Sequence, residues 1–257
     1  MSSELYWQVA GTGQNVVLLH GWGMNGAVWQ QSADKLSQYC RVHVVDLPGY
    51  GYSSERVELE LDTIAKAILE QAPKDAIWVG WSLGGLVASH IALHYSGYVR
   101  QLATVASSPK FAAQRPWRGI QPQVLDNFTE QLTEDFDGTI ERFMALQAMG
   151  SPSARKDVKV LKQSVLSRPS PNPQALLAGL KLLANVDLRQ ALTDITVPFL
   201  RMYGRLDGLV PVKVSEMLDN QYPKSRSVIF SQSSHAPFMT EPDAFCSELV
   251  DFMHNGQ

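Results

Sequence analysis

Short apolar runs alternate with helical stretches along most of the chain. The apolar runs lie at residues 16–19, 42–45, 76–79, 102–105, 198–203 and 227–230. Most of them lack the two-residue alternation of a half-exposed strand, which is typical of strands buried on both faces. Helical periodicity lies between them, at residues 28–36, 64–70, 83–94, 214–218 and 245–253. The alternation predicts an α/β fold with a mostly parallel, doubly wound sheet.

The start of the chain follows a different pattern. Residues 5–9 alternate between apolar and polar side chains, and Gly11-Thr12-Gly13 follows them. Alternation is typical of a strand with one exposed face, and the glycines favour a tight turn. We therefore expect an antiparallel edge hairpin between this strand and the next one along the chain.

The alternation of strands and helices stops between residues 109 and 187. Helical stretches remain at residues 124–131, 140–149 and 155–165, and Pro169, Pro171 and Pro173 predict a bend or loop after them. We predict an inserted helical lid at residues 109–187 and an α/β core formed by residues 1–108 and 188–257.

Length, charge and cysteine usage narrow the class of protein. The chain has 257 residues, 45% of them apolar, which suits one large domain. The only cysteines, Cys40 and Cys246, are far apart, so we expect reduced thiols in a cytoplasmic protein. We find no export signal and no apolar stretch long enough for a membrane helix. A formal charge of −3 argues against nucleic acid as a partner.

The strongest local signal is Gly80-Trp81-Ser82-Leu83-Gly84, between a predicted buried strand and a predicted helix. This is the context of a nucleophile elbow. Glycines are needed two positions away on either side because the strand must turn sharply into the helix. The sequence therefore predicts Ser82 as a nucleophile, held at the positive end of a helix dipole.

A second signal, His20-Gly21-Trp22-Gly23, follows the predicted strand at residues 16–19. A loop in this place completes the oxyanion hole of such enzymes. We predict the backbone N–H groups of Trp22 and Leu83 as the two donors. His20 is better explained as a residue that orients this loop.

A serine nucleophile needs a base of near-neutral pKa, and His235 follows the last predicted strand after a short loop. The other candidates, His43, His90, His94 and His254, are better explained as packed or solvated residues. The acid should lie between nucleophile and base in the chain, at the end of a strand. Asp207 meets both conditions, whereas Asp187 and Asp194 precede that strand. The end of the strand before it reads Ser107-Ser108-Pro109 and offers no carboxylate.

With Ser82, Asp207 and His235 in this order, the chain resembles the α/β-hydrolase superfamily from end to end. Within it, the chain is similar to a family of bacterial methyl ester esterases of biotin synthesis. The similar runs are residues 18–23, 78–88, 143–147, 206–211 and 234–238.

The resemblance implies a serine carboxylesterase that hydrolyses the methyl ester of a pimeloyl group carried on an acyl carrier protein. Such chemistry calls for no cofactor and no metal. It also implies a substrate site formed by Trp22, Ser82, Leu83, Phe143, Met144, Ala145, Leu146, Gln147 and His235.

Positive charge gathers in the predicted lid. Residues 142–168 hold six basic residues and one acidic residue. The rest of the chain holds sixteen basic and twenty-four acidic residues. Because acyl carrier proteins are acidic, this stretch could steer such a partner, although a solvated surface helix explains it equally well. The candidate docking residues are Arg142, Arg155, Lys156, Lys159 and Lys162. Gly138 lies where the resemblance implies a further basic residue.

Two alternatives remain. One is a general short-chain carboxylesterase that acts on small esters without a carrier-protein partner, since many activities share this fold and triad. The other is a non-catalytic ligand-binding protein, which would be expected to have lost triad members. Dehalogenase or epoxide hydrolase chemistry would need an aspartate at the elbow. We expect the protein to be a monomer.

Overall fold

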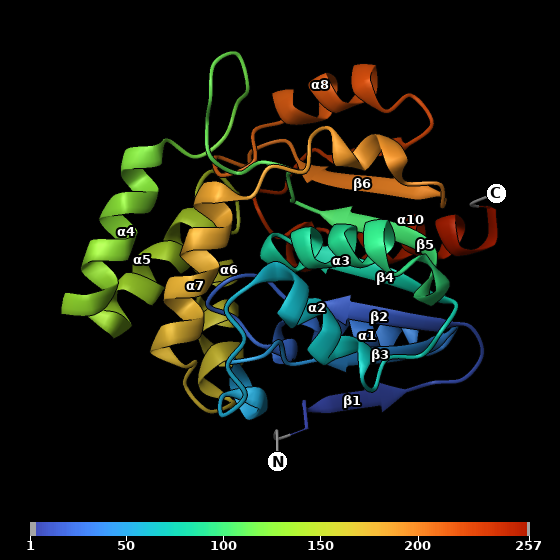
Figure 1. Cartoon of the computed structure of the whole chain (residues 1–257), viewed down its shortest axis with the longest axis horizontal. Helices are drawn as coiled ribbons and strands as arrows, with labels where there is room; N and C mark the ends of the chain where they lie inside the picture. The colour runs from blue at the N-terminus through green and yellow to red at the C-terminus, as the bar shows by residue number, and fades with distance from the viewer. Residues whose placement is uncertain (1–3, 256–257) are drawn as a thin grey trace.

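The computed structural model contains one mostly parallel sheet (Figure 1). It describes residues 4–255, apart from the side chain of Asp137. The strand order in this part of the chain is β1-β3-β2-β4-β5-β6-β7, with β1 antiparallel to β3 and all other pairs parallel. The strands are β1 (Trp7–Ala10), β2 (Asn15–Leu19), β3 (Arg41–Val45), β4 (Ala76–Trp81), β5 (Val99–Val105), β6 (Phe199–Gly204) and β7 (Arg226–Phe230). The predicted fold class is confirmed.

The predicted hairpin between the first two strands is wrong, because β1 pairs with a different strand. β1 is an antiparallel edge strand, but it pairs with β3, with Trp7 opposite Val45 and Ala10 opposite Val42. The next strand, β2, already has parallel neighbours on both sides, β3 and β4. Because both edges of β2 are occupied, β1 reaches only the free edge of β3.

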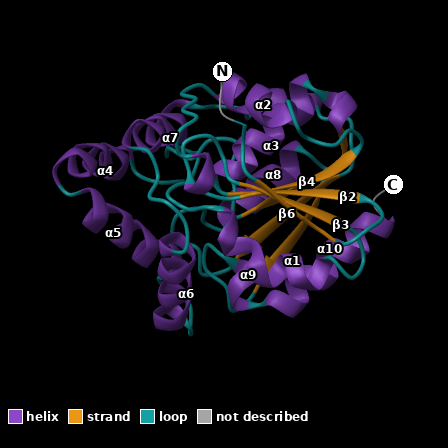
Figure 2. Ribbon diagram, turned by 90° about the horizontal axis from the view of Figure 1, so that it is seen from below, coloured by secondary structure: helices purple, strands orange, loops and turns teal. Residues whose placement is uncertain are grey.

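Helices cover both faces of the sheet (Figure 2). One face carries α2 (Leu61–Leu69), α3 (Leu83–His94) and α8 (Lys213–Gln221). The other carries α1 (Gln30–Leu36), α9 (Pro237–Thr240) and α10 (Pro242–Asn255). Short 3₁₀ turns η1 (Gly26–Trp29), η2 (Gly51–Ser53), η3 (Ser96–Tyr98) and η4 (Ala191–Asp194) join them. α3 is apolar almost all round because it contacts β4, β5, α2 and α7.

Four helices between β5 and β6 stand beyond the carboxyl ends of the parallel strands (Figure 1). They are α4 (Pro122–Glu134), α5 (Phe136–Ala148), α6 (Ala154–Leu166) and α7 (Pro173–Asn185). The sequence predicted the first three. The bend or loop expected around Pro169 and Pro171 is present at residues 167–172, but the sequence did not predict α7, which begins at Pro173. Pro173 is the first residue of α7, a position that needs no intrahelical N–H, and Asn172 Oδ1 caps the helix by accepting from the Gln174 N–H at 2.9 Å.

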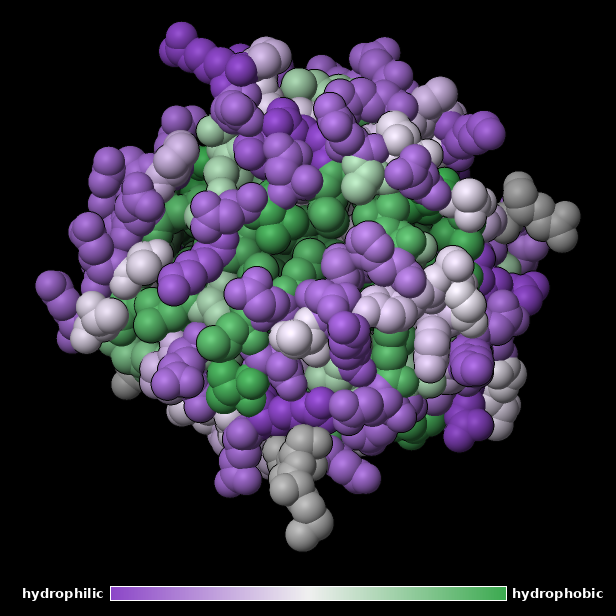
Figure 3. All heavy atoms as spheres, viewed as in Figure 1, coloured by the Kyte–Doolittle hydropathy of each residue, from purple (hydrophilic) through white to green (hydrophobic). Residues whose placement is uncertain are grey.

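Apolar side chains fill the interior, and polar side chains cover most of the face in Figure 3 around a hollow with an apolar floor. Within residues 4–255, no helix combines the length and apolarity needed to span a bilayer. Cys40 and Cys246 are free and buried, and burial raises the pKa of both thiols to about 11.

Candidate active site

The turn from β4 into α3 has the geometry of a nucleophile elbow. Ser82 has a φ of 54°, a region that residues other than glycine rarely adopt. A Cβ on Gly80 would lie 2.2 Å from the Gly84 carbonyl oxygen, and one on Gly84 would lie 2.6 Å from the His20 carbonyl oxygen. Glycine is therefore required at both positions, and Ser82 is fixed at the start of α3.

Ser82, His235 and Asp207 form a continuous hydrogen-bonded chain. Ser82 Oγ lies 2.9 Å from His235 Nε2, and His235 Nδ1 lies 2.8 Å from Asp207 Oδ2. Because a carboxylate only accepts, Nδ1 carries the proton and Nε2 is free to accept from the Ser82 hydroxyl. Asp207 Oδ1 accepts from the backbone N–H groups of Leu209 and Val210, at 2.8 and 3.0 Å, which fixes the carboxylate. All three residues are at most 5% exposed.

The backbone of His235 is held on both sides. Its N–H donates to the Gln147 carbonyl at the end of α5 (3.0 Å), and its C=O accepts from Trp81 Nε1 (2.7 Å). Ser234 Oγ also donates to the Met149 carbonyl at 2.9 Å. The base is therefore positioned between the strand of the elbow and the helices after β5.

The loop after β2 passes directly over the elbow. A Cβ on Gly21 would lie 3.2 Å from Ser82 Cβ, and Trp22 Nε1 donates to the Leu176 carbonyl of α7 at 2.8 Å. The Trp22 N–H makes no hydrogen bond within residues 4–255, and Leu83 is the first residue of α3, where helical N–H groups lack intrahelical partners. Both predicted oxyanion donors are thus without a hydrogen-bond partner in the described part of the chain, and their role stays a prediction.

His20 lies under this loop rather than in the triad. Its Nε2 accepts from the Leu47 N–H at 3.0 Å, which leaves Nδ1 to donate to the Gly21 carbonyl at 2.9 Å. Burial lowers the pKa of His20 to about 4, so the ring is neutral near pH 7. This matches the orienting role expected for it.

The remaining candidate bases and acids make other contacts. His43 pairs with Asn15, and His90 pairs with Asp62. Asp187 holds Arg189 and Lys110. None of these pairs includes a residue of the triad.

The predicted acyl-site residues of α5 divide between two faces of the helix. Phe143, Met144 and Gln147 are buried, Leu146 is half-buried and Ala145 is exposed. The Phe143 ring packs edge-on against Trp22, with centroids 4.6 Å apart. The structure therefore brings Phe143 against Trp22 and Gln147 beside His235, and it leaves Ala145 on the outer surface.

The predicted docking residues lie on α5 and α6 and differ in their partners. Arg142 pairs with Asp135 at 3.2 Å, and Lys162 pairs with Glu141. Three others are exposed on α6 and have no ion-pair partner among the described side chains: Arg155, Lys156 and Lys159. Arg168, counted in the basic stretch, is instead buried against Asp46.

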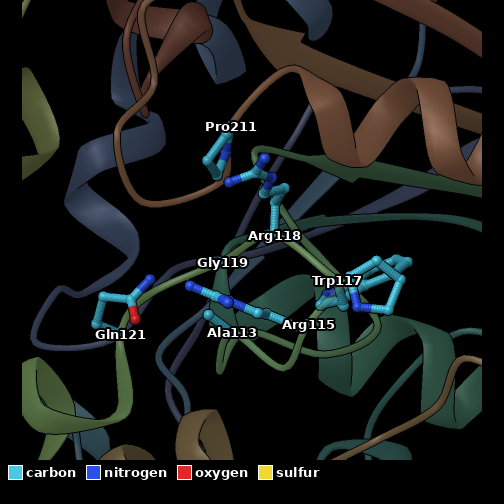
Figure 4. Close-up of a pocket in the computed structure, with 8 residues that line it drawn as sticks. Ala113, Arg115, Trp117, Arg118, Gly119, Gln121 and Pro211 are labelled. Atoms are coloured by element: carbon cyan, nitrogen blue, oxygen red, sulfur yellow. The ribbon is translucent and has the colours of Figure 1, made fainter.

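A hollow of about 790 Å³ lies outside the triad, on the loop before α4 (Figure 4). Arg115, Arg118, Gln121 and Pro211 are among its lining residues, and no triad residue lines it. Within residues 4–255 no cluster of side chains is suited to hold a metal ion.

Three residues that contact Trp22 or Ser82 were not predicted from the sequence. Leu176 holds Trp22, and Gly179 of α7 lies so close that its Cβ would fall 2.5 Å from Trp22 Cδ1. Ser107 Oγ donates to the Ser82 carbonyl at 2.8 Å. The helical spacing of Ala175, Leu176, Gly179, Leu180 and Leu183 could have predicted α7, but nothing local predicts its contact with Trp22.

Comparisons with known proteins agree with this geometry. A family model described as "alpha/beta hydrolase fold" matches residues 14–242. Relatives named pimeloyl-[acyl-carrier protein] methyl ester esterase include one from Vibrio cholerae serotype O1, 69% identical, covering 98% of this chain and 99% of the relative. Another, from Aliivibrio fischeri, is 56% identical and covers 99% of both chains.

Solved structures share the fold at lower identity. An esterase from Exiguobacterium antarcticum superposes with a TM-score of 0.87 at 24% identity, covering 98% of this chain and 96% of that one. An enol-lactonase from Burkholderia xenovorans has a TM-score of 0.84 at 18% identity, covering 98% and 96%. At these identities the likeness concerns the fold alone.

Proposed function

The chain belongs to the α/β-hydrolase family and, within it, to the pimeloyl-[acyl-carrier protein] methyl ester esterases, and from this premise we propose how its residues act. It is a carboxylic ester hydrolase. We propose that Ser82 attacks the methyl ester of a pimeloyl group on acyl carrier protein, in the cytoplasmic synthesis of biotin. The observation that carries this proposal is the buried chain from Ser82 Oγ through His235 to Asp207.

In the first half of the reaction, His235 Nε2 takes the Ser82 proton while Ser82 Oγ bonds to the ester carbonyl carbon. Asp207 keeps the second ring nitrogen protonated and stabilises the imidazolium. His235 then gives its proton to the methoxy oxygen. The C–O bond breaks, methanol leaves and an acyl-Ser82 ester remains.

In the second half, His235 takes a proton from water, and the resulting hydroxide attacks the acyl carbon. The Ser82–acyl bond breaks, Ser82 regains the proton, and free pimeloyl remains on its carrier. In both halves the Trp22 and Leu83 N–H groups stabilise the negative oxygen of the tetrahedral intermediate. Each such donor contributes about 3 kcal/mol in comparable sites.

The helices at residues 109–187 act in this proposal as a lid over the acyl chain. Phe143 and Met144 supply an apolar wall, as their burial and the packing of Phe143 on Trp22 suggest. Gln147 supplies a buried amide whose Oε1 has no partner within residues 4–255. Ala145 faces outward and is assigned no contact with the acyl group.

The carrier protein docks, in this proposal, on the outer face of α6. Support comes from Arg155, Lys156 and Lys159, which are exposed and lack acidic partners within the described residues, in a chain whose net charge is −3. Arg142 pairs with Asp135 at the start of α5, and Lys162 pairs with Glu141 on α5. These two basic residues therefore contribute less unpaired positive charge.

We also propose that the protein acts as a monomer. Among its exposed large apolar residues only Val160 and Leu166 share a described helix, α6, whereas others, such as Val9, Tyr39, Leu59 and Ile229, belong to separate segments. Light scattering during gel filtration tests this.

The function is tested by hydrolysis of the pimeloyl-carrier methyl ester by the purified protein, compared with ethyl and butyl esters of simple acids. The proposal predicts a much higher kcat/KM for the carrier-linked ester. Equal values would favour a general short-chain carboxylesterase. A protein that hydrolyses none of them and forms no adduct with a phosphonate would be a non-catalytic binder.

A further inference from the structure

Asp46 and Arg168 form an ion pair withdrawn from solvent, where the end of α6 meets the sheet. Arg168 Nη1 lies 2.6 Å from Asp46 Oδ1, and the two side chains are 6% and 0% exposed. The guanidinium also donates to Gln8 and lies over the rings of Tyr6 and Tyr52. Because burying charges carries a large desolvation penalty, such a pair is weak evidence for stability and invites another explanation.

The Asp46 carboxylate holds the backbone of two loops. Its Oδ1 accepts from the Gly26 N–H at 2.6 Å, and its Oδ2 accepts from the Tyr52 N–H at 2.8 Å. A Cβ on Gly26 would lie 3.0 Å from Arg168 Nη1 and 3.1 Å from Asp46 Oδ1. The backbone at Gly26 therefore rests directly on the ion pair.

Gly26 is only four residues from Trp22, and the intervening chain is tightly folded. The Met24 N–H donates to the Gly21 carbonyl at 3.3 Å. Asn25 Oδ1 caps η1, and Asn25 Nδ2 donates to the Val165 carbonyl near the end of α6 at 3.2 Å. Because these hydrogen bonds hold residues 21–26 rigidly, a displacement of Gly26 would also displace the Trp22 N–H.

We propose that Arg168 is a positioning residue for ester hydrolysis, fixing through Asp46 the loop that presents the Trp22 N–H to the oxyanion. The inference rests on the function proposed above. The segment just after the C-terminal end of α6 thereby takes part in catalysis, because the Arg168–Asp46 ion pair joins the proposed lid to residues 20–26, the oxyanion loop.

Arginine suits this position better than lysine. Its flat guanidinium places one nitrogen on Asp46 and another on Gln8 while its faces meet Tyr6 and Tyr52. A lysine would keep the positive charge but could not place two nitrogens in one plane on Asp46 and Gln8. We therefore expect Arg168→Lys to retain part of the function and Arg168→Gln to retain little.

The test measures steady-state hydrolysis of a small soluble methyl ester, with active sites counted by phosphonate titration. Arg168→Gln should lower kcat per titrated site by about 10- to 100-fold, the effect of small misplacements in other enzymes, with KM little changed. Affinity for a trifluoromethyl ketone, whose adduct places an oxyanion in the same hole, should fall in parallel. Arg168→Lys should recover part of both.

Arg201→Gln is the matched control. Arg201 is 1% exposed and pairs with Asp219 at the same 2.6 Å. Its other partners, Tyr203, Ser215 and Ser225, lie on β6, on α8 and in the loop before β7, away from the loop of Trp22. Arg201→Gln should lower the Tm and leave kcat per titrated site and ketone affinity unchanged. If Arg168→Gln does not fold, Asp46→Asn replaces it, with the same expected loss.

An unchanged kcat per titrated site in Arg168→Gln or Asp46→Asn would overturn the inference, as would an equal loss in Arg201→Gln. An active wild type with unaffected variants would contradict the positioning role alone. A wild type that hydrolyses no ester would contradict the proposed function as well.

Discussion

At the residue scale, His20 couples stability to pH. Burial lowers its pKa from 6.5 to about 4, so between these values the unfolded chain binds the proton more readily than the folded protein. The stability contributed by neutral His20 is complete above pH 6.5 and is lost as the pH falls toward 4. We expect a loss of about 3 kcal/mol across this window from this residue.

Denaturant unfolding of the wild type and His20→Gln at several pH values checks this. The variant should be less stable at pH 7, since Leu47 and Gly21 lose their partner, but its unfolding free energy should depend less on pH. His43 and His90, whose pKa values burial also lowers, remain in both proteins, so the difference isolates His20. Parallel pH curves would contradict the assignment.

Asp207 fixes which nitrogen of His235 carries the proton. In Asp207→Asn, an amide N–H facing Nδ1 would force the proton onto Nε2, which could then no longer accept from Ser82. We expect kcat to fall by about 10⁴-fold with the fold retained, as in other triads. Asp187→Asn is the control, because in the described part of the chain Asp187 forms ion pairs with Arg189 and Lys110 and with no residue of the triad. Its kcat should match the wild type.

Residues whose role follows from local sequence could be predicted, and residues that act across the fold could not. Ser82 is marked by its glycines, and Asp207 and His235 by their place after strands. Ser107 and Leu176 carry no such mark, because each acts by one hydrogen bond to a residue 25 or 154 positions away. Such contacts arise only once the sheet order is fixed.

At the scale of elements, α7 positions the oxyanion loop. In Gly179→Ala, the added Cβ would lie 2.5 Å from the ring of Trp22, which is buried and cannot move aside. Although alanine favours a helix by about 1 kcal/mol over glycine, we expect this contact to dominate and to lower both Tm and kcat. A variant more stable and as active as the wild type would contradict this.

Gly97→Ala provides the control for that substitution, since a Cβ there meets nothing within 4 Å. Its kcat should equal that of the wild type. The pair separates the effect of the Trp22 contact from the general effect of replacing glycine by alanine.

The outer face of α6 should matter for the carrier-linked substrate alone. Reversing the charges of Arg155 and Lys159 to Glu should lower kcat/KM for the carrier-linked ester, more at low salt than at high salt, and leave a small ester unaffected. Lys213→Glu with Lys224→Glu makes the same charge change on exposed residues at α8 and before β7, outside α4–α7. Equal losses with both substrates, or equal effects of both pairs, would count against docking on α6.

At the scale of the whole molecule, the sequence indicated the α/β fold and the position of the inserted helices, because buried strands and helical periodicity are local signals. It missed the partner of β1 and the helix α7. The first depends on which sheet edge stays free, and the second on a proline that begins a helix instead of ending one. Both depend on context outside the local pattern.

In the proposed function, Ser82 is the nucleophile of a carrier-linked methyl ester esterase. The most direct test is the rate of methanol release from the pimeloyl-carrier methyl ester by the wild type and by Ser82→Ala, each with its fold verified by its Tm. We predict rapid release by the wild type and a loss of about 10⁴- to 10⁶-fold in the variant. Near-normal release by Ser82→Ala would contradict the account.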